Sequence, residues 1–517
     1  MATAAPALPL YKSGMTKGRH AAIPIAAMLA MLLQVLDTTI ANVALPHMQT
    51  SLGATPETVN WVLTSYIVAS AIAIPITGWL TDRVGRKRLF TWAVFAFTGF
   101  SVLCAVATSL TEMVLFRAAQ GIAGAFIVPL SQAVLFDINP PERHARAMAM
   151  FGGGIMIGPI LGPVLGGWLT EYMNWRWVFL VNLPVGMLAA VMLIRFLPST
   201  GKRKMRFDLF GFALLAVALG ALQMMLDRGQ QQDWFQSWEV MIEAFLALGA
   251  AWMFVVHMMS ARQPLLPPQL FADRNFVTSL LFMAVTGVLL LAGLALLPPL
   301  LQRLFGYSVL DSGFLTAPRG IGSLISMIIA GRLVGKVDSR LLILAGILLM
   351  ALSLWQMSGF SLDMDRRPIV ISGIVQGLGI GLMFVPLQSL AFAGLNPAMR
   401  TTAASLFNLS RSIGGSIGIS VVTTFLARNL QTSHADLAAH VTNSTLANLP
   451  PQIASVSPVS QTALAMLDAE INRQAAMIAY IDDFHLMMLV CLAVVPLLLL
   501  LKKPKQMGGG GPPVMAD

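Results

Sequence analysis

The sequence predicts an all-α polytopic membrane protein, and three observations support this prediction. Of the 517 residues, 56% are hydrophobic and 11% are charged, whereas a soluble domain carries about a quarter charged residues. The mean hydropathy is +0.75. Apolar runs of about 20 residues recur along the whole chain, and each can cross about 30 Å of hydrocarbon as a helix. The runs are too long and too uniformly apolar for barrel strands, so helices are expected to satisfy the backbone in lipid.

Counting these runs predicts 14 transmembrane spans, with boundaries good to a few residues. They cover residues 21–46, 58–80, 89–109, 113–136, 146–170, 177–197, 208–226, 239–259, 276–301, 311–334, 340–360, 368–393, 402–426 and 483–501. An even number of spans places both termini on the same side of the membrane.

The basic residues predict which side that is. Of the 33 Lys and Arg residues, 21 lie in the two tails and in the connections on their side, whereas 7 lie in the opposite connections and 5 lie within or at the ends of spans. Cytoplasmic loops carry an excess of Lys and Arg, so both termini are predicted to be cytoplasmic. The net charge of +10 is therefore attributed to topology, and no nucleic-acid partner is expected.

An internal repeat divides the chain into two halves. GWLTDRV at 78–84 is similar to GRLVGKV at 331–337, and QGIAGAFIVPL at 120–130 is similar to QGLGIGLMFVPL at 376–387. The offset is 253 in the first pair and 256 to 257 in the second, and the partners occupy the same positions within their halves. Spans 1–6 and 9–14 are thus predicted to be two copies of a six-helix unit, with the substrate site between them.

Five segments follow from this repeat. They are a cytoplasmic tail at 1–20, an N-terminal six-helix bundle at 21–200, two inserted helices with basic linkers at 201–275, a C-terminal bundle at 276–501 that includes a long periplasmic loop at 427–482, and a disordered cytoplasmic tail at 502–517.

The connection after span 2 reads GWLTDRVGRKRLF and is a candidate gating loop. Its candidate residues are Gly78, Asp82, Arg83, Gly85, Arg86 and Lys87. Glycine permits positive φ and close packing in a tight connection, and Asp82 near Arg83 and Arg86 predicts a charge network that forms in one conformation and breaks in another. Basic anchoring of a short loop is the alternative reading.

An aspartate within the first span predicts a buried ion pair. Asp37 lies about 13 Å from the end of span 1 and Arg117 lies about 6 Å from the same side in span 4, so a long arginine side chain can bridge the difference. Burial raises the free energy of an ionised carboxyl, whereas a nearby arginine lowers it. Because the two effects oppose each other, a carboxyl in this position can be poised to take up and release a proton. A structural ion pair that never titrates is the alternative.

Span 5 is the candidate antiporter helix. It carries Gly-Pro twice, at Gly158, Pro159, Gly162 and Pro163. Proline interrupts the helical hydrogen bonds and glycine lets another helix approach closely. These features predict a tightly packed helix between the halves that resists proton leak, although generic helix packing explains them equally well.

A polar face in span 13 is the candidate substrate cavity. Asn408 and Arg411 lie one turn apart near mid-membrane, and we add Arg319, Gln34 and Gln120 as further tentative lining residues. No metal site and no enzyme activity are expected, because the spans contain no cluster of His, Asp and Glu with metal-ligand spacing and no nucleophile–base pair.

These motifs together resemble a known family. LDTTIANVALP in span 1, GWLTDRVGRKRLF, Arg117 followed by Gln120-Gly121, and GPILGP resemble motifs of the major facilitator superfamily, and with 14 spans they are similar to the drug:proton antiporters of the EmrB/QacA type, in particular EmrB-like exporters. The resemblance implies proton-driven export of amphipathic toxic compounds by alternating access, without a cofactor, in a bacterial inner membrane. It implies proton-coupling roles for Asp37 and Arg117.

The resemblance also implies partners. EmrB-like exporters work with a periplasmic adaptor (EmrA-like) and an outer-membrane channel (TolC-like), besides protons, small amphipathic substrates and membrane lipid. Residues 461–481 are expected to form an amphipathic helix within the long outer connection. A partner surface, a lid on the domain and a helix lying on the lipid surface all remain open for it.

The embedded charges favour a substrate class. Asp37 is the one deeply embedded carboxylate expected from the sequence, against Arg117, Arg411 and Arg319. A cavity with an excess of fixed cations favours anionic, weakly acidic or neutral amphipaths. The alternative is an exporter of a physiological metabolite, such as a siderophore, sugar or fatty acid, with incidental drug resistance. A sensor that retains a transporter fold is a further, weaker alternative.

Overall fold

The computed structural model describes residues 17–55, 58–202, 206–441 and 461–502. Within these ranges it contains 14 helices long and apolar enough to cross a membrane, as the sequence predicts. The bounds of the first half are α1 Lys17–Ser51, α2 Trp61–Ala73 with η2 Ile74–Ile76 and α3 Thr77–Val84, α4 Arg86–Val106, α5 Leu110–Gly124 with α6 Ile127–Ile138, η3 Pro141–Arg143, α7 His144–Tyr172, and α8 Trp177–Leu180 with α9 Asn182–Phe196.

The remaining elements complete the second half and the insertion. The inserted pair consists of α10 Leu209–Arg228, η4 Trp234–Gln236 and α11 Trp238–Ser260. The second half consists of α12 Gln269–Ala272, α13 Arg274–Pro299 with the π-helical turn η5 Leu300–Leu304, α14 Val309–Leu333, α15 Ser339–Ser358, α16 Arg367–Ala393, η6 Pro397–Met399, α17 Arg400–Ala439, and α20 Gln461–Ala493 with η7 Val495–Leu500.

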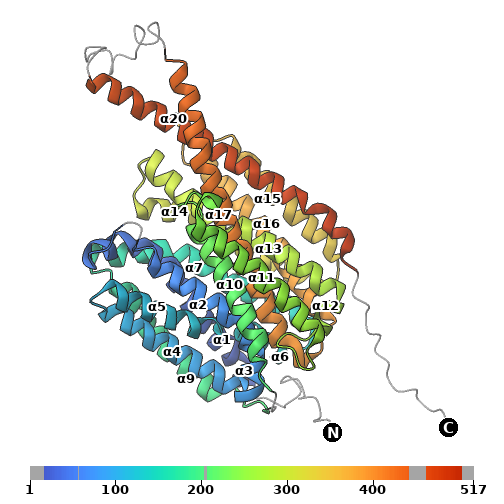
Figure 1. Ribbon diagram of the computed structural model, residues 1–517. Helices are drawn as coiled ribbons and strands as arrows, with labels where there is room; N and C mark the ends of the chain where they lie inside the picture. Colours follow the sequence, from blue (N-terminus) through green and yellow to red (C-terminus); the bar gives the residue numbers. More distant parts are fainter. Residues whose placement is uncertain (1–16, 56–57, 203–205, 442–460, 503–517) are drawn as a thin grey trace, which may run out of the picture.

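Figure 1 shows the two halves side by side, with the blue and cyan helices of the first half opposite the orange and red helices of the second. The green inserted helices α10 and α11 lie across the boundary. Successive spans alternate in direction, so the start of α1 and the end of η7 share one face. We call this the inner face, and the face from which α17 and α20 project the outer face. The positive-inside pattern predicts that the inner face is cytoplasmic.

The helices of the outer connection run further than the predicted spans. α17 continues past residue 426 to Ala439, and the helix expected at 461–481 is present as the first part of α20, which runs without a break from Gln461 into the last span. The two helices form an outer arm, defined here as 427–439 and 461–482, which projects from the bundle in Figure 1. His434 Nε2 lies 3.0 Å from Asp468 Oδ1 and Asn429 Nδ2 donates to Asp482 Oδ2 at 3.3 Å, which ties the two helices together. The predicted disordered tail lies almost entirely outside the described residues.

The inner end of the inserted pair is anchored by Asp208. Its carboxylate caps α10 by accepting from Gly211 N at 2.9 Å, and it also accepts from Leu265 N at 3.1 Å and lies 2.9 Å from His257 Nε2. Burial opposes ionisation, but these N–H donors outweigh it and hold the pKa of Asp208 below its usual value. α10 and α11 are thereby joined near the inner face.

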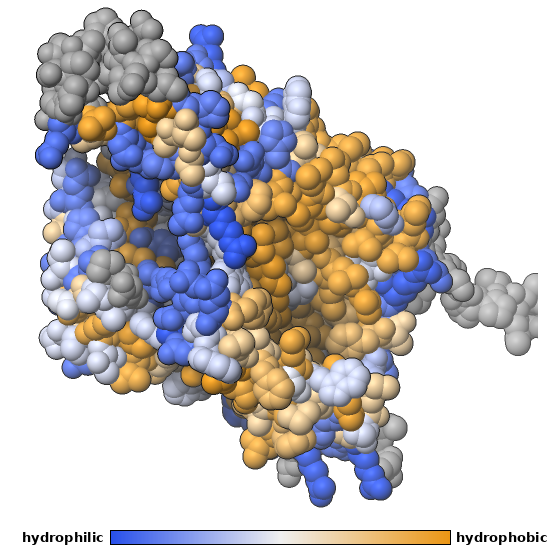
Figure 2. Space-filling model, turned by 45° about the horizontal axis from the view of Figure 1, so that its top comes forward, coloured by the Kyte–Doolittle hydropathy of each residue, from blue (hydrophilic) through white to orange (hydrophobic). Residues whose placement is uncertain are grey.

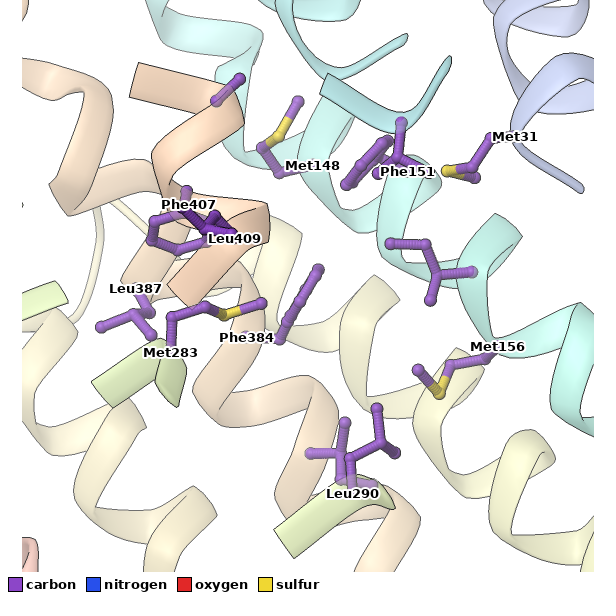
Figure 3. Packing of buried hydrophobic residues seen from close by; sticks show 14 of the residues in the cluster. Met31, Met148, Phe151, Met156, Met283, Leu290, Phe384, Leu387, Phe407 and Leu409 are labelled. Atoms are coloured by element: carbon purple, nitrogen blue, oxygen red, sulfur yellow. The ribbon is translucent and has the colours of Figure 1, made fainter. Parts of the chain in front are cut away.

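Methionine and phenylalanine fill much of the core where the halves meet. Figure 3 shows side chains of this core, among them Met148, Phe151 and Met156 of α7, Met283 of α13 and Phe384 of α16. Methionine is unbranched and polarisable, so it packs against changing partners with little strain. A core of this kind tolerates rearrangement of the packing between the halves.

Candidate functional site

The structure brings Asp37 and Arg117 together as a fully buried ion pair. Arg117 Nη1 lies 2.7 Å from Asp37 Oδ2, and their side chains are 1% and 0% exposed. The guanidinium also donates from Nε to Val62 O at 3.1 Å and lies 4.4 Å above the ring of Tyr66. Helices α1, α2 and α5 therefore meet at this pair.

Two amides complete the coordination of Asp37. Gln120 Nε2 donates to Asp37 Oδ1 at 3.0 Å, and Asn182 Nδ2 donates to the same oxygen at 2.7 Å. Asn182 also lies 2.9 Å from Ser101 Oγ of α4. Gln120 was predicted as a cavity residue, but the structure places it fully buried in this network. The sequence patterns considered above do not single out Asn182. Its signal in the sequence is that of a lone amide side chain within an apolar span.

The coordination of Asp37 fits a proton-exchange site. A buried ion needs a counter-ion and hydrogen bonds, and losing one partner of a buried pair costs about 3–5 kcal/mol. Protonation of Asp37 would leave Arg117 with no carboxylate in this network, which joins five helices. Whether Asp37 titrates remains a prediction.

The gating-loop residues lie at the inner ends of the halves. Gly85 adopts φ of +94°, which an L side chain rarely tolerates, and this lets α4 start directly after α3. Gly78 leaves no room for a Cβ against Thr402 of α17. Arg83 is exposed, with its guanidinium 5.3 Å from the Trp79 ring, and Lys87 is half-buried.

The charge network around Arg86 has an acidic member that the sequence did not single out. Asp137, at the end of α6, forms a salt bridge with Arg86. Asp137 Oδ1 also accepts from Arg400 Nη1 of the second half at 2.9 Å, and Arg86 Nη2 donates to Thr401 Oγ1 at 3.2 Å. Asp82 is half-buried and takes part in an interaction of its own. One carboxylate thus joins cations from both halves.

Two further layers close the inner end above this charge cluster. Gln132 Nε2 donates to Gln388 Oε1 at 3.0 Å, and the rings of Phe136 and Phe392 stack with centroids 4.5 Å apart. Both pairs are separated by 256 residues, the offset of the internal repeat, so each joins equivalent positions of the two halves. This shared offset is the sequence signal that could have identified them.

The predicted cavity residues separate into two groups. Asn408 Nδ2 donates to Gln132 Oε1 at 2.8 Å and Asn408 is 5% exposed, so in this conformation it belongs to the closed inner end, and its role in a cavity stays a prediction. Arg319 donates one long hydrogen bond, 3.4 Å to Leu290 O, and Arg411 is half-buried with its Nε unbonded. Gln34 is also half-buried, with Oε1 unbonded. No salt bridge forms at Arg319 or Arg411 in the part of the chain that the structure describes.

A second fully buried carboxylate corrects the predicted charge balance. Asp483 of α20 is 0% exposed, and neither of its oxygens has a hydrogen-bond partner among the described residues. The sequence predicts Asp37 as the one deeply embedded carboxylate, because Asp483 lies at the predicted edge of the last span. The continuous helix α20 places it inside the bundle instead.

The antiporter helix packs against both halves, as predicted. Gly158 and Gly162 leave no room for a Cβ against Val35 and Thr39 of α1, and Thr39 Oγ1 donates to Gly158 O at 3.2 Å. Pro159 and Pro163 lie within the continuous helix α7. On its other side, Pro163 and Val164 contact α14 at Gly313. A role in preventing proton leak stays a prediction.

Comparison with known proteins identifies the family. The model of the Major Facilitator Superfamily matches residues 27–419. The chain belongs to the major facilitator superfamily. It is 35% identical over 460 residues to the multidrug export protein EmrB of Escherichia coli K12, covering 88% of this chain and 90% of that protein. It is 36% identical over 416 residues to the fatty acid resistance protein FarB of Neisseria gonorrhoeae, covering 80% and 82%.

A solved structure agrees with the fold. The human organic anion transporter MFSD10 (TETRAN) aligns with a TM-score of 0.57 at 16% sequence identity, covering 91% of this chain and 99% of that one. Membership of the superfamily makes this chain a multi-pass secondary transporter and not an enzyme. The predicted resemblance and fold class are thereby confirmed.

The three inner layers generate a prediction about Asp137. Asp137→Asn removes the one carboxylate that Arg86 and Arg400 share, so the inner end should open more often. We expect a cysteine reporter at the buried residue Ala391 to react at least threefold faster with a membrane-impermeant thiol reagent applied from the inner face. The control is Asp365→Asn, whose carboxylate is 65% exposed. Equal labelling rates in the two variants would show that Asp137 does not hold the inner end closed.

Proposed function

We propose that this superfamily member is a proton-coupled antiporter that exports hydrophobic and amphipathic toxic compounds by alternating access. The observation that carries the proposal is the Asp37–Arg117 pair, a buried carboxylate held by one guanidinium and two amides. The multidrug export names of the EmrB relatives support the same activity. The internal repeat supplies two halves that can rock about a site between them.

The conformation fits one stage of such a cycle. The inner ends of the halves are joined by the charge cluster, the phenylalanine stack and the glutamine pair. Figure 2, which looks partly onto the outer face, shows a hollow rimmed by hydrophilic side chains. An exporter in this state has released its substrate outward and takes up a proton from the same side. We assign that proton to Asp37.

The first test uses proteoliposomes that contain this protein alone. With an imposed pH gradient, we expect the wild type to couple efflux of the fluorescent anion 8-anilinonaphthalene-1-sulfonate to proton movement. Asp37→Asn should bind the dye yet lose coupled proton flux at least tenfold, because the titrating group is gone while its shape is kept. Asp482→Asn is the matched control. Thermal unfolding of each variant shows whether the protein stays folded when Arg117 loses its carboxylate partner. Normal coupling in Asp37→Asn would make Asp37 structural, with Glu243 and Asp82 the next carboxylates to examine.

The unpaired arginines favour anionic, weakly acidic or neutral substrates. Arg117 is neutralised by Asp37, whereas Arg319 and Arg411 form no salt bridge within the described residues. A guanidinium buried without a carboxylate is a preformed site for an anionic group. The methionine-rich core beside them can receive an apolar tail. A fatty acid exporter is the alternative, and the name of FarB supports it.

Charge-removing variants test this preference. Arg411→Gln and Arg319→Gln should each reduce export of 8-anilinonaphthalene-1-sulfonate about fivefold or more, because the anionic headgroup loses its partner. Export of ethidium, a cation, should be unchanged or faster. Arg303→Gln, in η5 near the outer face, is the control. A parallel loss of both dyes would indicate that the arginines serve packing and not substrate charge.

We further propose that the outer arm docks a periplasmic adaptor of the EmrA type, which would connect the exporter to an outer-membrane channel of the TolC type. The arm projects beyond the membrane-spanning part of α17 and α20, and it exposes the apolar residues Leu464 and Met466 at 49% and 44%. Exposed apolar side chains on a projecting helix pair are suited to a protein partner. The positive-inside pattern predicts that this surface lies in the periplasm.

A paired measurement tests the docking of an adaptor. Leu464→Ser with Met466→Ser should lower drug resistance of cells that carry the adaptor at least fourfold, while antiport in proteoliposomes stays within about twofold of the wild type. Leu464→Met with Met466→Leu keeps the apolar surface and serves as the control. Full resistance in the serine variant would exclude these residues as the docking surface.

A further inference from the structure

The repeat makes two of the contacts between the halves symmetry counterparts. Spans 2 and 10 are equivalent, as are spans 5 and 13, so the contact of α7 with α14 corresponds to the contact of α17 with α2 and α3. A symmetric transporter would close both contacts in the same way. In this chain the two contacts differ over their outer parts.

The contact between α7 and α14 runs from the inner to the outer face. Near the inner face, a Cβ on Gly331 would lie 3.0 Å from the Cβ of Ala149. In the middle, Gly320 leaves no room for a Cβ against Ile160, and near the outer face a Cβ on Gly313 would lie 3.0 Å from Val164 Cγ2. The glycines of both helices thus let them touch along their length.

The counterpart contact joins α17 directly to α3 and η2 over the inner part of span 2, and only sparsely to α2 beyond them. At the outer face, α17 bonds instead to the inserted pair. Ser420 Oγ donates to Leu226 O of α10 at 2.8 Å, and Trp234 Nε1 donates to Thr424 Oγ1 at 3.1 Å. The inserted pair therefore stands between α17 and the first half where the symmetric helix contact would be expected.

The other side of α10 is attached to α2. Asp227 accepts a hydrogen bond from Thr64 Oγ1, and the guanidinium of Arg228 lies 5.8 Å from the ring of Trp61. Further toward the middle, a Cβ on Gly220 would meet Ile72 Cδ1 at 3.4 Å, so the helices pack closely. The attachment of α10 to α2 combines a hydrogen bond to a carboxylate, a cation–π contact and helix packing. It is therefore more extensive than the attachment of the inserted pair to α17.

The turn after α10 holds Trp234 in an unusual conformation. Asp233 and Trp234 have φ of 52° and 54° and are the only non-glycine residues with positive φ in the described part of the chain. Positive φ is rare for a bulky residue and persists only when the surroundings enforce it. Here Gly229 leaves space for the indole ring, and Arg228 braces the hairpin by pairing with Glu239 at 2.8 Å and Glu243 at 3.7 Å. The strained turn directs the indole N–H to α17.

We propose that the inserted α10–α11 hairpin is the outer wall of the boundary between the halves: it travels with the first half through α2 and closes against α17 through Trp234 when the outer side is open. The proposal rests on the alternating-access function. In the outward-facing conformation the wall covers the gap between α2 and α17, so the hollow opens to water at the outer face and not sideways into lipid. The contact with α17 must break when the outer ends close.

Two cysteine pairs test the proposal in a Cys104→Ser, Cys491→Ser background. The pair Thr64→Cys and Asp227→Cys ties the hairpin to the first half, and the pair Trp234→Cys and Thr424→Cys ties it to the second. After treatment with a short bifunctional thiol reagent in proteoliposomes, the first pair should keep at least half of its untreated dye export rate. The second pair should lose at least tenfold. The single-cysteine variants, treated in the same way, correct for simple modification.

A second measurement does not depend on transport. Adding Asp137→Asn, which weakens the inner closure, should lower the cross-linking yield of the 234/424 pair at least threefold and leave the yield of the 64/227 pair unchanged. Export that survives the 234/424 cross-link, export that is abolished by the 64/227 cross-link, or equal effects of Asp137→Asn on both yields would overturn the proposal. A protein that exports no dye but shows the unequal yields would contradict the proposed substrate and support the wall.

A matched tryptophan pair gives an independent check. Trp234→Ala should reduce dye export at least fivefold, whereas Trp238→Ala, whose side chain in the same hairpin is 77% exposed, should stay within twofold. Thermal unfolding of both variants separates loss of fold from loss of the contact. Equal export by the two variants would contradict a role for Trp234 in closing the wall.

Discussion

The rest of the structure depends on the burial of one carboxylate. Asp37 lies in the first membrane span with no exposed surface, and hydrocarbon cannot solvate an ion. Four helices besides α1 contribute to its stabilisation, through Arg117 and Gln120 of α5, Asn182 of α9, Val62 O and Tyr66 of α2, and Ser101 of α4. The first half is therefore assembled around one buried ion pair and the amides that hold it. Loss of one partner would leave buried polar groups unsatisfied in several helices.

The two halves are held together by chemically different contacts at different depths. At the inner face the contacts are polar and directional. Two arginines share the carboxylate of Asp137, and Gln132 pairs with Gln388 at the equivalent position of the other half. Such contacts have a well-defined formed state and a well-defined broken state, since water can replace each partner. Between α7 and α14 the contact is instead made by glycine and apolar side chains, which can slide without leaving a buried polar group unsatisfied. The two kinds of contact thus differ in the free energy that it costs to shift them.

The contacts that α7 and α17 make with the opposite half differ, and the inserted helices α10 and α11 lie where they differ. The Gly-Pro repeats occur in α7 and not in α17, and the α7–α14 contact is continuous while the α17 contact with the first half is direct at the inner end and mediated by α10 at the outer end. A repeat protein that moves one interface more than the other needs something to cover the gap that this movement opens. The inserted helices occupy that position, with the strained Trp234 turn at their outer end.

The sequence by itself determined the number of spans, the repeat, the close packing of the Gly-Pro helix and the pairing of Asp37 with Arg117. These features are encoded locally, in apolar run length, in motif spacing and in the cost of leaving an ion unpaired in lipid. Only the tertiary structure decided that Asp137 joins Arg86 to Arg400 and that Asn408 packs in the closed inner end. It also decided that Asp483 of α20 is buried within the helix bundle. Each of these depends on which residues distant in sequence meet across a helix interface, and helical periodicity gives the face of a helix but not its neighbour.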